Sequence, residues 1–337
     1  MFDIAKSLTG RTILTGDRPT GPLHLGHLTG SLMSRVKLQD RNRQTVLVAD
    51  LQALTDNAGN PSRVSDNVME VMLDYLAVGI DPSKTCFARQ SGLPALAELT
   101  VLYMNLVTLP RLMRNPTIRS EVESRGFGEG IPAGFLCYPV SQAADITAFG
   151  ADLVPAGADQ APIIEQTNDI VTAINRLAGG EVLRPVVLFD GAAPRLPGID
   201  GQGKMSKSAG NAIFIKDSPD EIRRKVMMMF TDPGHLRVSD PGRVEGNVVF
   251  AMLDAFDPDQ GELETLKEHY RAGGLGDMVL KRRLDAILQE LLRPIRERRE
   301  MHAGDMDQVR RLLEQGTEEA RIVTGQTLSK VRSAFML

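Results

Sequence analysis

The sequence predicts an α/β protein with a parallel β-sheet in its first domain and a smaller α-helical domain after it. Three observations carry this prediction. Short apolar runs alternate with amphipathic stretches up to about residue 214, helical periodicity dominates from residue 215, and a chain of 337 residues exceeds one typical domain. We therefore expect domains over residues 1–214 and 215–316, and a last helix over residues 317–337 that packs back on the first domain.

The strands are predicted from short runs of apolar residues that are bounded by glycine, proline and polar turn residues. Strands that alternate with helices along a chain form parallel sheets, and helices then cover both faces of the sheet. The expected strands lie at residues 12–15, 45–49, 86–88, 153–155 and 186–189.

Amphipathic stretches between these strands predict the covering helices. In the first of them, Leu28, Leu32 and Val36 fall on one face. Asn60 is a favourable capping residue and Pro61 a favourable first residue for the next helix. We expect helices over about residues 26–41 and 61–78, another from residue 94, and one that ends near residue 148 after the glycine-rich loop 125–134.

Helical periodicity dominates after residue 215. Ser218 and Glu221 have the spacing of a capping box, in which each side chain bonds the backbone N–H of the other residue. A long helix is expected over about residues 277–301, with an interruption at Pro294 because proline lacks the N–H that a helix interior needs. This segment is predicted to form a helical domain.

Composition restricts the class of protein. Apolar residues make up 42% and charged residues 24% of the chain, as in ordinary soluble proteins. The N-terminus lacks the pattern of a signal peptide and no apolar run is long enough to span a bilayer, so we expect a cytoplasmic protein without a membrane partner. Cys86 and Cys137 lack paired metal-ligand spacing and are expected to be reduced thiols.

The first motif with chemical content is Pro-Leu-His-Leu-Gly-His at residues 22–27. It lies between a predicted strand and the following helix, where backbone N–H groups and two imidazoles face one place, as a triphosphate requires. Gly26 lets a flat ring approach the backbone, and His24 and His27 can donate hydrogen bonds to phosphate. A surface pair or a metal pair is the alternative; no third ligand lies nearby in the sequence, and we assign no metal-ligating residue.

The second motif is Lys-Met-Ser-Lys-Ser at residues 204–208. Gly198, Gly201 and Gly203 precede it and predict a mobile loop, whose Lys204 and Lys207 can fold over a leaving pyrophosphate. A solvated, lysine-bearing loop is the alternative interpretation. Together the two motifs indicate adenylation of a carboxylic acid by ATP.

These residues resemble the two hallmark motifs, of the HIGH and KMSKS type, of class I aminoacyl-tRNA synthetases. Nearly the whole chain is similar to bacterial tryptophanyl-tRNA synthetases, above all at residues 75–82, 138–146 and 154–160. The resemblance implies a Rossmann-like catalytic domain, a helical anticodon-binding domain and a homodimer. It also implies a ligase of protein biosynthesis that uses ATP and Mg²⁺, forms tryptophanyl-adenylate, and transfers the acyl group to tRNA(Trp).

The same resemblance implies roles for individual residues. The catalytic residues would be His24, His27, Lys204 and Lys207. Asp145 would accept the indole N–H of tryptophan, and Tyr138, Gln142 and Gln160 would complete the tryptophan site. Of these, Tyr138 and Gln160 would bind the ammonium group. An acceptor suits this task because indole offers one donor and no acceptor. The ATP-binding residues would be Arg18, Pro19, Thr20, Gly26, His27, Gly157, Ala158, Asp159, Leu196, Lys204, Met205, Ser206, Lys207 and Ser208.

Several alternatives stay open at this point. The family often has methionine where this chain has Gln142, and the spacing of Tyr138, Gln142 and Asp145 also resembles tyrosyl-tRNA synthetases. A small adenylyltransferase shares the histidine motif but resembles a much shorter chain. A synthetase-like regulatory protein, with an auxiliary partner that the sequence does not identify, is the third alternative. With a formal net charge of −4, tRNA binding requires a local basic patch, for which we expect Arg282, Arg283, Arg296, Arg298 and Arg299.

Overall fold

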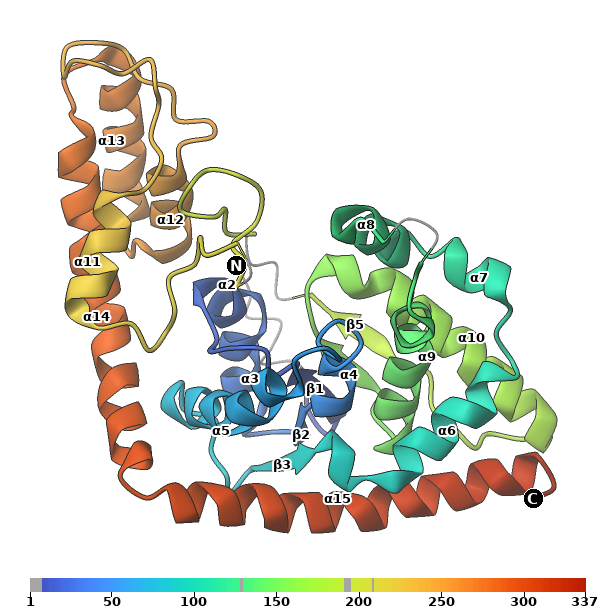
Figure 1. Ribbon diagram of the computed structural model, residues 1–337. Coiled ribbons are helices and arrows are strands. Elements are labelled where there is room, and N and C mark those ends of the chain that lie inside the picture. Colours follow the sequence, from blue (N-terminus) through green and yellow to red (C-terminus); the bar gives the residue numbers. More distant parts are fainter. Residues whose placement is uncertain (1–7, 128–129, 191–194, 208) are drawn as a thin grey trace.

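The computed structural model describes residues 8–127, 130–190, 195–207 and 209–337. A central sheet is covered by helices, a helical arm rises beside it, and one long helix runs beneath both (Figure 1). The predicted α/β fold with a parallel sheet and a helical C-terminal part is confirmed.

Five parallel strands form the sheet in the order β3-β2-β1-β4-β5. β1 lies in the middle, and the chain winds outwards from it in both directions, so the order reverses between β1 and β4. The carboxyl ends of two such strands leave a crevice, which is where open α/β sheets bind ligands. The strands, each at a predicted position, are β1 Thr12–Asp17, β2 Arg43–Val48, β3 Thr85–Arg89, β4 Leu153–Pro155 and β5 Val187–Phe189.

The first covering helix forms as one continuous run with a π-helical middle turn, and it ends at Leu38 rather than near residue 41. The side chain of Asn60 caps the next helix by accepting from the backbone N–H of Arg63, and Pro61 follows it, as predicted. The bounds are α2 Leu25–His27, η1 Leu28–Leu32, α3 Met33–Leu38, α4 Asp50–Ala53 and α5 Pro61–Ala77.

A helical segment connects β3 to β4. Its last helix lies where the sequence predicts one, whereas α8 was not predicted because its exposed, charged residues give no apolar stripe. The bounds are η2 Gln90–Gly92, α6 Pro94–Met104, α7 Leu109–Met113, α8 Pro116–Arg125 and α9 Ala133–Ala148, with η3 Ala158–Gln160 and α10 Ala161–Ala178 after β4.

The helical arm consists of α11 Pro219–Met227, α12 Val248–Phe256, α13 Gln260–Ala272 and the upper part of α14 Asp277–Ala303. Ser218 and Glu221 form the predicted capping box. The predicted interruption at Pro294 is wrong, because α14 continues through it. Leu292 and Ile295 on either side are buried, and this packing offsets the loss of one backbone hydrogen bond.

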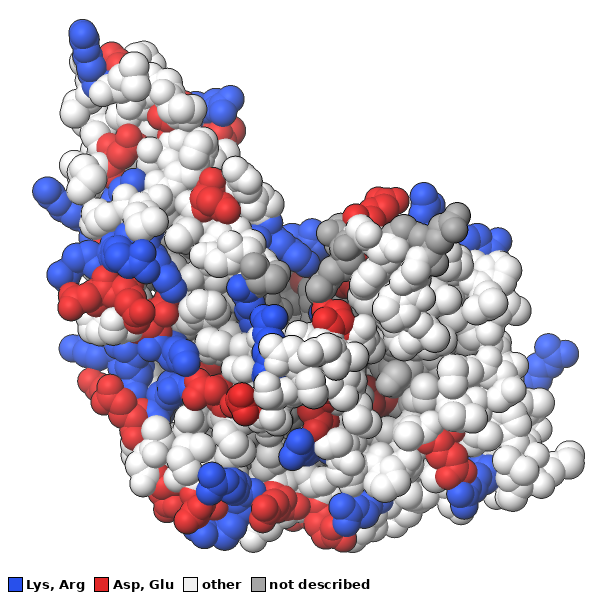
Figure 2. Space-filling model, in the orientation of Figure 1, with Lys and Arg blue, Asp and Glu red and all other residues white. Residues whose placement is uncertain are grey.

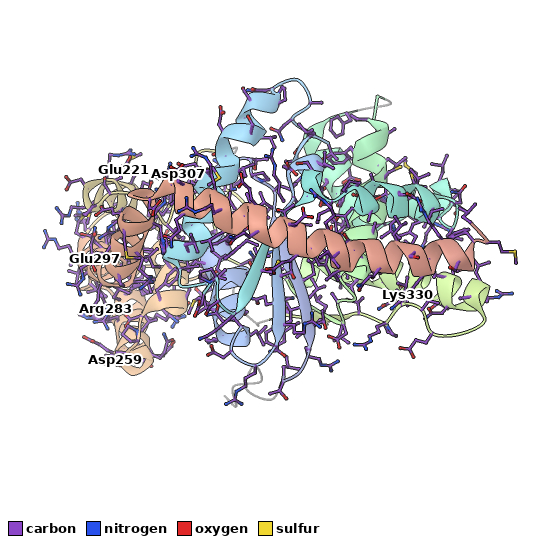
Figure 3. All side chains as sticks on the ribbon, turned by 90° about the horizontal axis from the view of Figure 1, so that it is seen from below. Glu221, Asp259, Arg283, Glu297, Asp307 and Lys330 are labelled. Atoms are coloured by element: carbon purple, nitrogen blue, oxygen red, sulfur yellow. The ribbon has the colours of Figure 1, made fainter. Side chains whose placement is uncertain are left out.

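The long helix α15, Met306–Ala334, crosses beneath the sheet. Seen from below in Figure 3, it runs from Asp307 beside the helical arm to Lys330 at the other end of the molecule. It contacts β3, α6, α9 and α10. Gly316 permits this contact, because a Cβ there would lie 2.2 Å from the carbonyl oxygen of Phe87. The helix is continuous across residue 317, where the sequence places a domain boundary.

Alternate residues of β2 enter two separate cores. Val46 and Val48 belong to an apolar cluster that extends through α5 into the helical arm, where it includes Leu284. Leu47 belongs to a second cluster on the opposite face, with Ala320 of α15. This alternation is the period of two that a strand imposes, and it lets one sheet support both the arm and the long helix.

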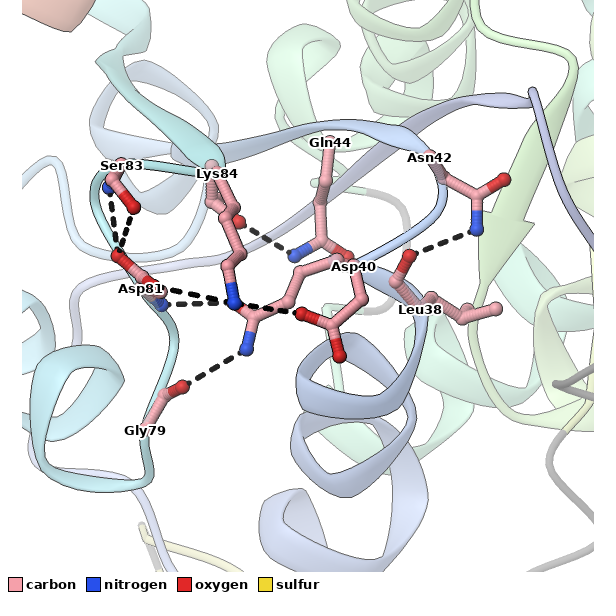
Figure 4. A network of polar contacts seen from close by, with 10 residues as sticks. Leu38, Asp40, Asn42, Gln44, Gly79, Asp81, Ser83 and Lys84 are labelled. Carbon is pink, nitrogen blue, oxygen red and sulfur yellow. Dashed lines mark hydrogen bonds and ion pairs between the residues drawn. The ribbon is translucent and has the colours of Figure 1, made fainter.

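A network of polar contacts lies at the amino ends of β2 and β3 (Figure 4). Lys84 pairs with Asp40 at 2.8 Å and Asp81 at 3.5 Å, and the Gln44 amide donates to the hydroxyl of Thr85 at 3.0 Å. This network lies at the opposite end of the sheet from the crevice. It therefore supplies matched control positions for the experiments below.

Two smaller expectations concern the membrane and the cysteines. Within the described part of the chain, every helix is too short or too polar to cross a membrane. Cys86 and Cys137 are free thiols. Burial raises the pKa of the Cys86 thiol to about 11, so it is protonated at neutral pH and unreactive.

Candidate active site

A cavity of about 950 Å³ opens at the carboxyl ends of β1 and β4. It brings together nearly all of the predicted site residues. Pro19 is buried and does not line the cavity, and Ser208 lies outside the described residues. The predicted residues that line it are Arg18, Thr20, His24, Gly26, His27, Tyr138, Gln142, Asp145, Gly157, Ala158, Asp159, Gln160, Leu196, Lys204, Met205, Ser206 and Lys207.

His24 and His27 form a capping box at the start of α2. Nδ1 of His24 accepts from the backbone N–H of Gly26 at 3.1 Å, and Nδ1 of His27 accepts from the backbone N–H of His24 at 3.2 Å. Both Nδ1 atoms are therefore acceptors, and each neutral ring carries its proton on Nε2. The local hydrogen bonds thus fix the tautomer of both rings.

Electrostatics keeps both rings neutral. Burial, His27 and Lys207 lower the pKa of His24 to about 2. Burial lowers the pKa of His27 to about 4, although the carboxylate of Asp17 opposes this shift. At neutral pH the two side chains are therefore hydrogen-bond donors without a charge, and the positive charge near them comes from lysine and arginine.

Gly26 has a second role beyond the close approach that the sequence suggests. A Cβ at this position would lie 2.9 Å from Cε1 and 3.0 Å from Nδ1 of His24. A side chain would push the His24 ring out of its capping position. The glycine therefore protects the arrangement of the histidines as well as the space beside the backbone.

Sequence reasoning missed a buried cluster behind the histidines. The Asp17 carboxylate accepts from the Arg35 guanidinium at 2.7 Å and from the Tyr75 hydroxyl at 2.8 Å. Burial raises the pKa of Asp17, but the charge of Arg35 and the hydrogen bonds from Arg35 and Tyr75 outweigh burial and hold it well below its usual value. Arg35 lies three residues after Leu32 on the buried face of its helix. A charged residue at such a position indicates that a group of opposite charge lies beside it.

The lysine motif lies beside the histidine motif because the backbone joins them. Leu25 N–H donates to the carbonyl of Ile213, and Ile215 N–H donates to the carbonyl of Leu23, both at 3.0 Å. The Lys207 ammonium donates to the carbonyl of Gly21 at 2.7 Å. Burial lowers the pKa of Lys207 to about 8. This lysine is therefore held in the cavity by the loop of the first motif.

The glycines before the lysine motif build its turns. Gly201 and Gly203 have φ values of 73° and 64°, which side chains other than glycine rarely adopt. A Cβ on Gly198 would lie 2.1 Å from the amide nitrogen of Asn211, and the Asn211 oxygen accepts from Ser206 N–H at 2.9 Å. The predicted mobility of this loop stays a prediction, while its shape depends on these glycines.

The other side of the cavity is formed by α9 and η3. Tyr138, Gln142 and Asp145 lie on one face of α9 at helical spacing, and the Gln142 amide donates to the Gln160 oxygen at 3.4 Å. Asp145 is only 3% exposed. The structure thus brings the four predicted tryptophan-binding residues to the lining of this cavity.

Asp145 has a neutral partner rather than a cation. The Gln90 amide donates to both of its carboxylate oxygens, at 3.0 and 2.8 Å. Burial raises the pKa of Asp145 to about 7, and the bond from Gln90 opposes this rise. Sequence reasoning missed Gln90, although it directly follows β3 at the carboxyl end of the sheet, where site residues are expected.

The segment after β4 lines the cavity where the sequence predicts contacts with the nucleotide. Gly157 is packed closely, since a Cβ there would lie 2.8 Å from the Asp159 carboxylate. The Asp159 carboxylate lies 3.5 Å from Arg195, and its carbonyl accepts from the Thr117 hydroxyl at 3.0 Å. Leu196 is 3% exposed and presents an apolar wall.

The arginines expected to bind tRNA mostly hold the protein together. Arg283 pairs with Asp257 at 2.6 Å, and Arg299 pairs with Asp74 at 3.0 Å. Arg298 donates to the carbonyl of Ala77 and Arg296 to the amide oxygen of Gln289. Among the five candidates, Arg282 is the exposed one. Arg283, Arg298 and Arg299 thus join α14 to neighbouring elements, and Arg296 bonds within α14. A contact of these five arginines with tRNA stays a prediction.

Comparison with known proteins agrees with this geometry. Residues 9–293 match the family model described as "tRNA synthetases class I (W and Y)". A tryptophan–tRNA ligase of Clostridium longisporum is 55% identical over 327 residues, covering 96% of each chain. One of Streptococcus agalactiae is 53% identical over 337 residues, covering 98% of this chain and 99% of that relative.

A solved structure shares the whole architecture. The tryptophanyl-tRNA synthetase of Campylobacter jejuni, complexed with ADP and tryptophan, superposes with a TM-score of 0.81 at 26% identity, covering 97% of this chain and 100% of that one. The family match, the identities and the fold agree over nearly the full length. The chain therefore belongs to the class I tRNA synthetases of the tryptophan and tyrosine group.

Proposed function

We propose that this enzyme activates L-tryptophan with ATP to tryptophanyl-adenylate and transfers the tryptophanyl group to tRNA(Trp). The observation that carries the proposal is that one cavity joins both ATP motifs to the buried carboxylate of Asp145. The relatives named tryptophan–tRNA ligase favour tryptophan over tyrosine. The relative with ADP and tryptophan supports an adenine nucleotide in the same cavity.

The first step joins the two sides of the cavity. A carboxylate oxygen of tryptophan attacks the α-phosphorus of ATP, an O–P bond forms, and the bond to pyrophosphate breaks. His24 and His27 donate their Nε2–H groups to phosphate oxygens, while Lys204 and Lys207 balance the charge that grows on pyrophosphate. In the second step a hydroxyl at the 3′ end of tRNA attacks the acyl carbon, and AMP leaves.

Different residues would contact the phosphates, the adenine and the nucleoside of ATP. Arg18 and Thr20 would contact phosphate from the first motif, together with Ser206 of the second. Leu196 and Met205 would pack against adenine, and Gly26 and Gly157 to Asp159 would leave room for the nucleoside. This assignment is supported by the observation that all of these residues line the same cavity.

Mg²⁺ would enter as the ATP complex. In residues 8–337, apart from the three gaps named above, no three side chains of His, Cys, Asp or Glu converge as a metal site. Mg²⁺ keeps water and phosphate ligands in such enzymes and needs few protein ligands. The ion would lower the charge of the phosphates, and the chain's own residues would orient them.

The helical arm is proposed to bind the anticodon of tRNA(Trp). Lysine and arginine side chains gather over this part of the surface, interspersed with acidic ones (Figure 2). Exposed basic residues that could contact phosphate are Arg223, Arg224, Arg237, Arg243, Arg271, Arg282 and Arg293. A contact of this kind makes tRNA affinity fall steeply with added salt. We also propose a cytoplasmic location, because the proposed substrate is tRNA.

A homodimer is proposed through α6 and α7. Large apolar side chains are exposed there: Val101 at 56%, Met104 at 40%, Leu109 at 64% and Met113 at 46%. A surface of this kind usually marks a protein interface. Light scattering should give a dimer for the parent and a monomer for Leu109→Glu, whereas a monomeric parent would contradict this proposal.

Pyrophosphate exchange tests the main proposal. The enzyme should exchange labelled pyrophosphate into ATP with tryptophan, and far more slowly with tyrosine or phenylalanine. Charging of tRNA(Trp) should follow with the same amino acid. Preference for tyrosine would overturn the tryptophan assignment, and activation without transfer to tRNA would favour a regulatory protein.

A further inference from the structure

The carboxylate of Asp145 accepts hydrogen bonds from the side chain of Gln90, on the side away from the cavity. Gln90 is 1% exposed and does not line the cavity, whereas Asp145 does. The amide nitrogen of Gln90 reaches both carboxylate oxygens, at 3.0 and 2.8 Å. A donor shared by both oxygens fixes the plane of the carboxylate, so that its remaining lone pairs face the cavity.

The orientation of the Gln90 amide is itself fixed. Its oxygen accepts from the backbone N–H of Gln52, at the start of α4, at 2.9 Å. If the amide turned over, its NH₂ group would face the Gln52 N–H and its oxygen would face the carboxylate, so both contacts would become repulsive. The backbone of α4 therefore determines that Asp145 meets a donor.

The segment that carries Gln90 is braced on both sides. Ser91 donates its N–H and its hydroxyl to the carboxylate of Asp50, at 2.9 and 2.6 Å. From beneath, Arg321 of α15 donates two hydrogen bonds to the carbonyl of Gly92, both at 3.1 Å. These bonds prevent η2 from withdrawing Gln90 from Asp145, and they make the long helix part of the support of the amino-acid site.

We propose that Gln90 is a positioning residue that orients Asp145 for recognition of the indole N–H of tryptophan. This inference rests on the proposed role of Asp145 and extends it by one residue. Without the amide, the buried carboxylate would lose its one side-chain donor among the described contacts, and it would both reorient and bind a proton more readily. Either change weakens acceptance of an indole N–H.

The test uses Gln90→Met, which keeps the length of the side chain and removes the donor. Pyrophosphate exchange is measured with tryptophan and with 3-benzothienylalanine, in which sulfur replaces the indole N–H. The variant should raise KM for tryptophan about tenfold and leave kcat and the KM of the analogue nearly unchanged. The pH at which KM for tryptophan begins to rise should also move upward.

Three further variants make the result decisive. Gln44→Met removes a buried glutamine from the network at the far end of the sheet and should change neither KM. Gln90→Asn, whose amide is too short to reach Asp145, should repeat the tryptophan defect if Gln90→Met does not fold. Gln90→Met combined with Asp145→Ala should behave like Asp145→Ala alone, because Gln90 acts through that carboxylate.

The outcomes separate the two ideas. Equal losses with tryptophan and the analogue, or additive losses in the double variant, would show that Gln90 only packs, and would overturn this inference. If Asp145→Ala itself leaves the preference for tryptophan unaltered, the proposed role of Asp145 fails first. A selective tryptophan defect in Gln90→Met, with no further loss when this substitution is added to Asp145→Ala, would support both.

Discussion

The proposed phosphate side and the proposed amino-acid side of the cavity are built in opposite ways. On the phosphate side, the functional groups lie within short motifs: His24 and His27 are three residues apart, and so are Lys204 and Lys207. On the amino-acid side, Asp145 depends on Gln90, which is 55 positions away in the chain. The proposed phosphate-binding groups are thus close together in sequence within each motif, while the proposed selectivity depends on a buried contact that only the fold creates.

The two sides also differ in what burial does. Burial keeps the histidines neutral and lowers the pKa of Lys207. The proposed phosphate side therefore combines uncharged histidine donors with a lysine that loses its charge more easily than an exposed lysine. Burial raises the pKa of Asp145, so the amino-acid side holds an acceptor that is close to protonation. Desolvation disfavours the charged form in both cases, with opposite consequences for acid and base. The following predictions test this contrast.

The largest effect is expected from the ion pair that supports the phosphate side. Arg35→Met should lower the free energy of unfolding by about 3–5 kcal/mol, because it leaves the Asp17 carboxylate buried without its cation. Urea unfolding measures this value. Lys84→Met, which breaks an exposed pair, should change the free energy of unfolding far less. Equal stability of the two variants would contradict the support that we assign to Arg35.

The next effect concerns the leaving group. Lys207→Ala should reduce kcat of pyrophosphate exchange by roughly 10²–10³-fold, because a preorganised cation is lost where charge develops. KM for tryptophan should stay within about twofold, since the substrate lies on the other side of the cavity. Lys84→Ala is the control and should retain the parent rate. A Lys207→Ala enzyme with unchanged kcat would remove this residue from catalysis.

Sequence alone identified most of the residues that line the cavity but not the contacts that hold them in place. The five strands, the motif positions and Asp145 follow from local patterns, and nearly all of the predicted site residues that the structure describes line one cavity. Gln90 and the contacts of Arg35 could not be predicted with their partners, because residues distant in sequence make them. The partners of the arginines expected to bind tRNA could not be predicted for the same reason, since arginine in a helix pattern does not reveal which group lies opposite.

A smaller effect is expected from the acceptor. Asp145→Ala should lower kcat/KM for tryptophan by about 10–100-fold, which corresponds to loss of one hydrogen bond to a charged group. The rate with phenylalanine should change little, so the preference for tryptophan narrows. Pyrophosphate exchange with both amino acids provides the measurement. If both amino acids lose equally, Asp145 supports the pocket instead of reading the indole.

The smallest effect, and the one that addresses both sides at once, is the dependence on pH. Asp145 has a raised pKa of about 7, so it gains a proton as the pH falls through 7, and KM for tryptophan should rise up to about tenfold per unit below that. Lys207 has a lowered pKa of about 8, so it loses its proton above 8, and kcat/KM for ATP should fall there.

The two limbs of this pH profile should respond to different variants. Asp145→Asn cannot titrate and should abolish the acid limb for tryptophan without moving the alkaline limb for ATP. Lys207→Arg stays charged at every accessible pH and should flatten the alkaline limb alone. The profiles are measured by pyrophosphate exchange between pH 5.5 and 9, varying one substrate at a time at saturation of the other. If either variant shifts both limbs, the two sides of the cavity titrate as one coupled unit, and the contrast between them is wrong.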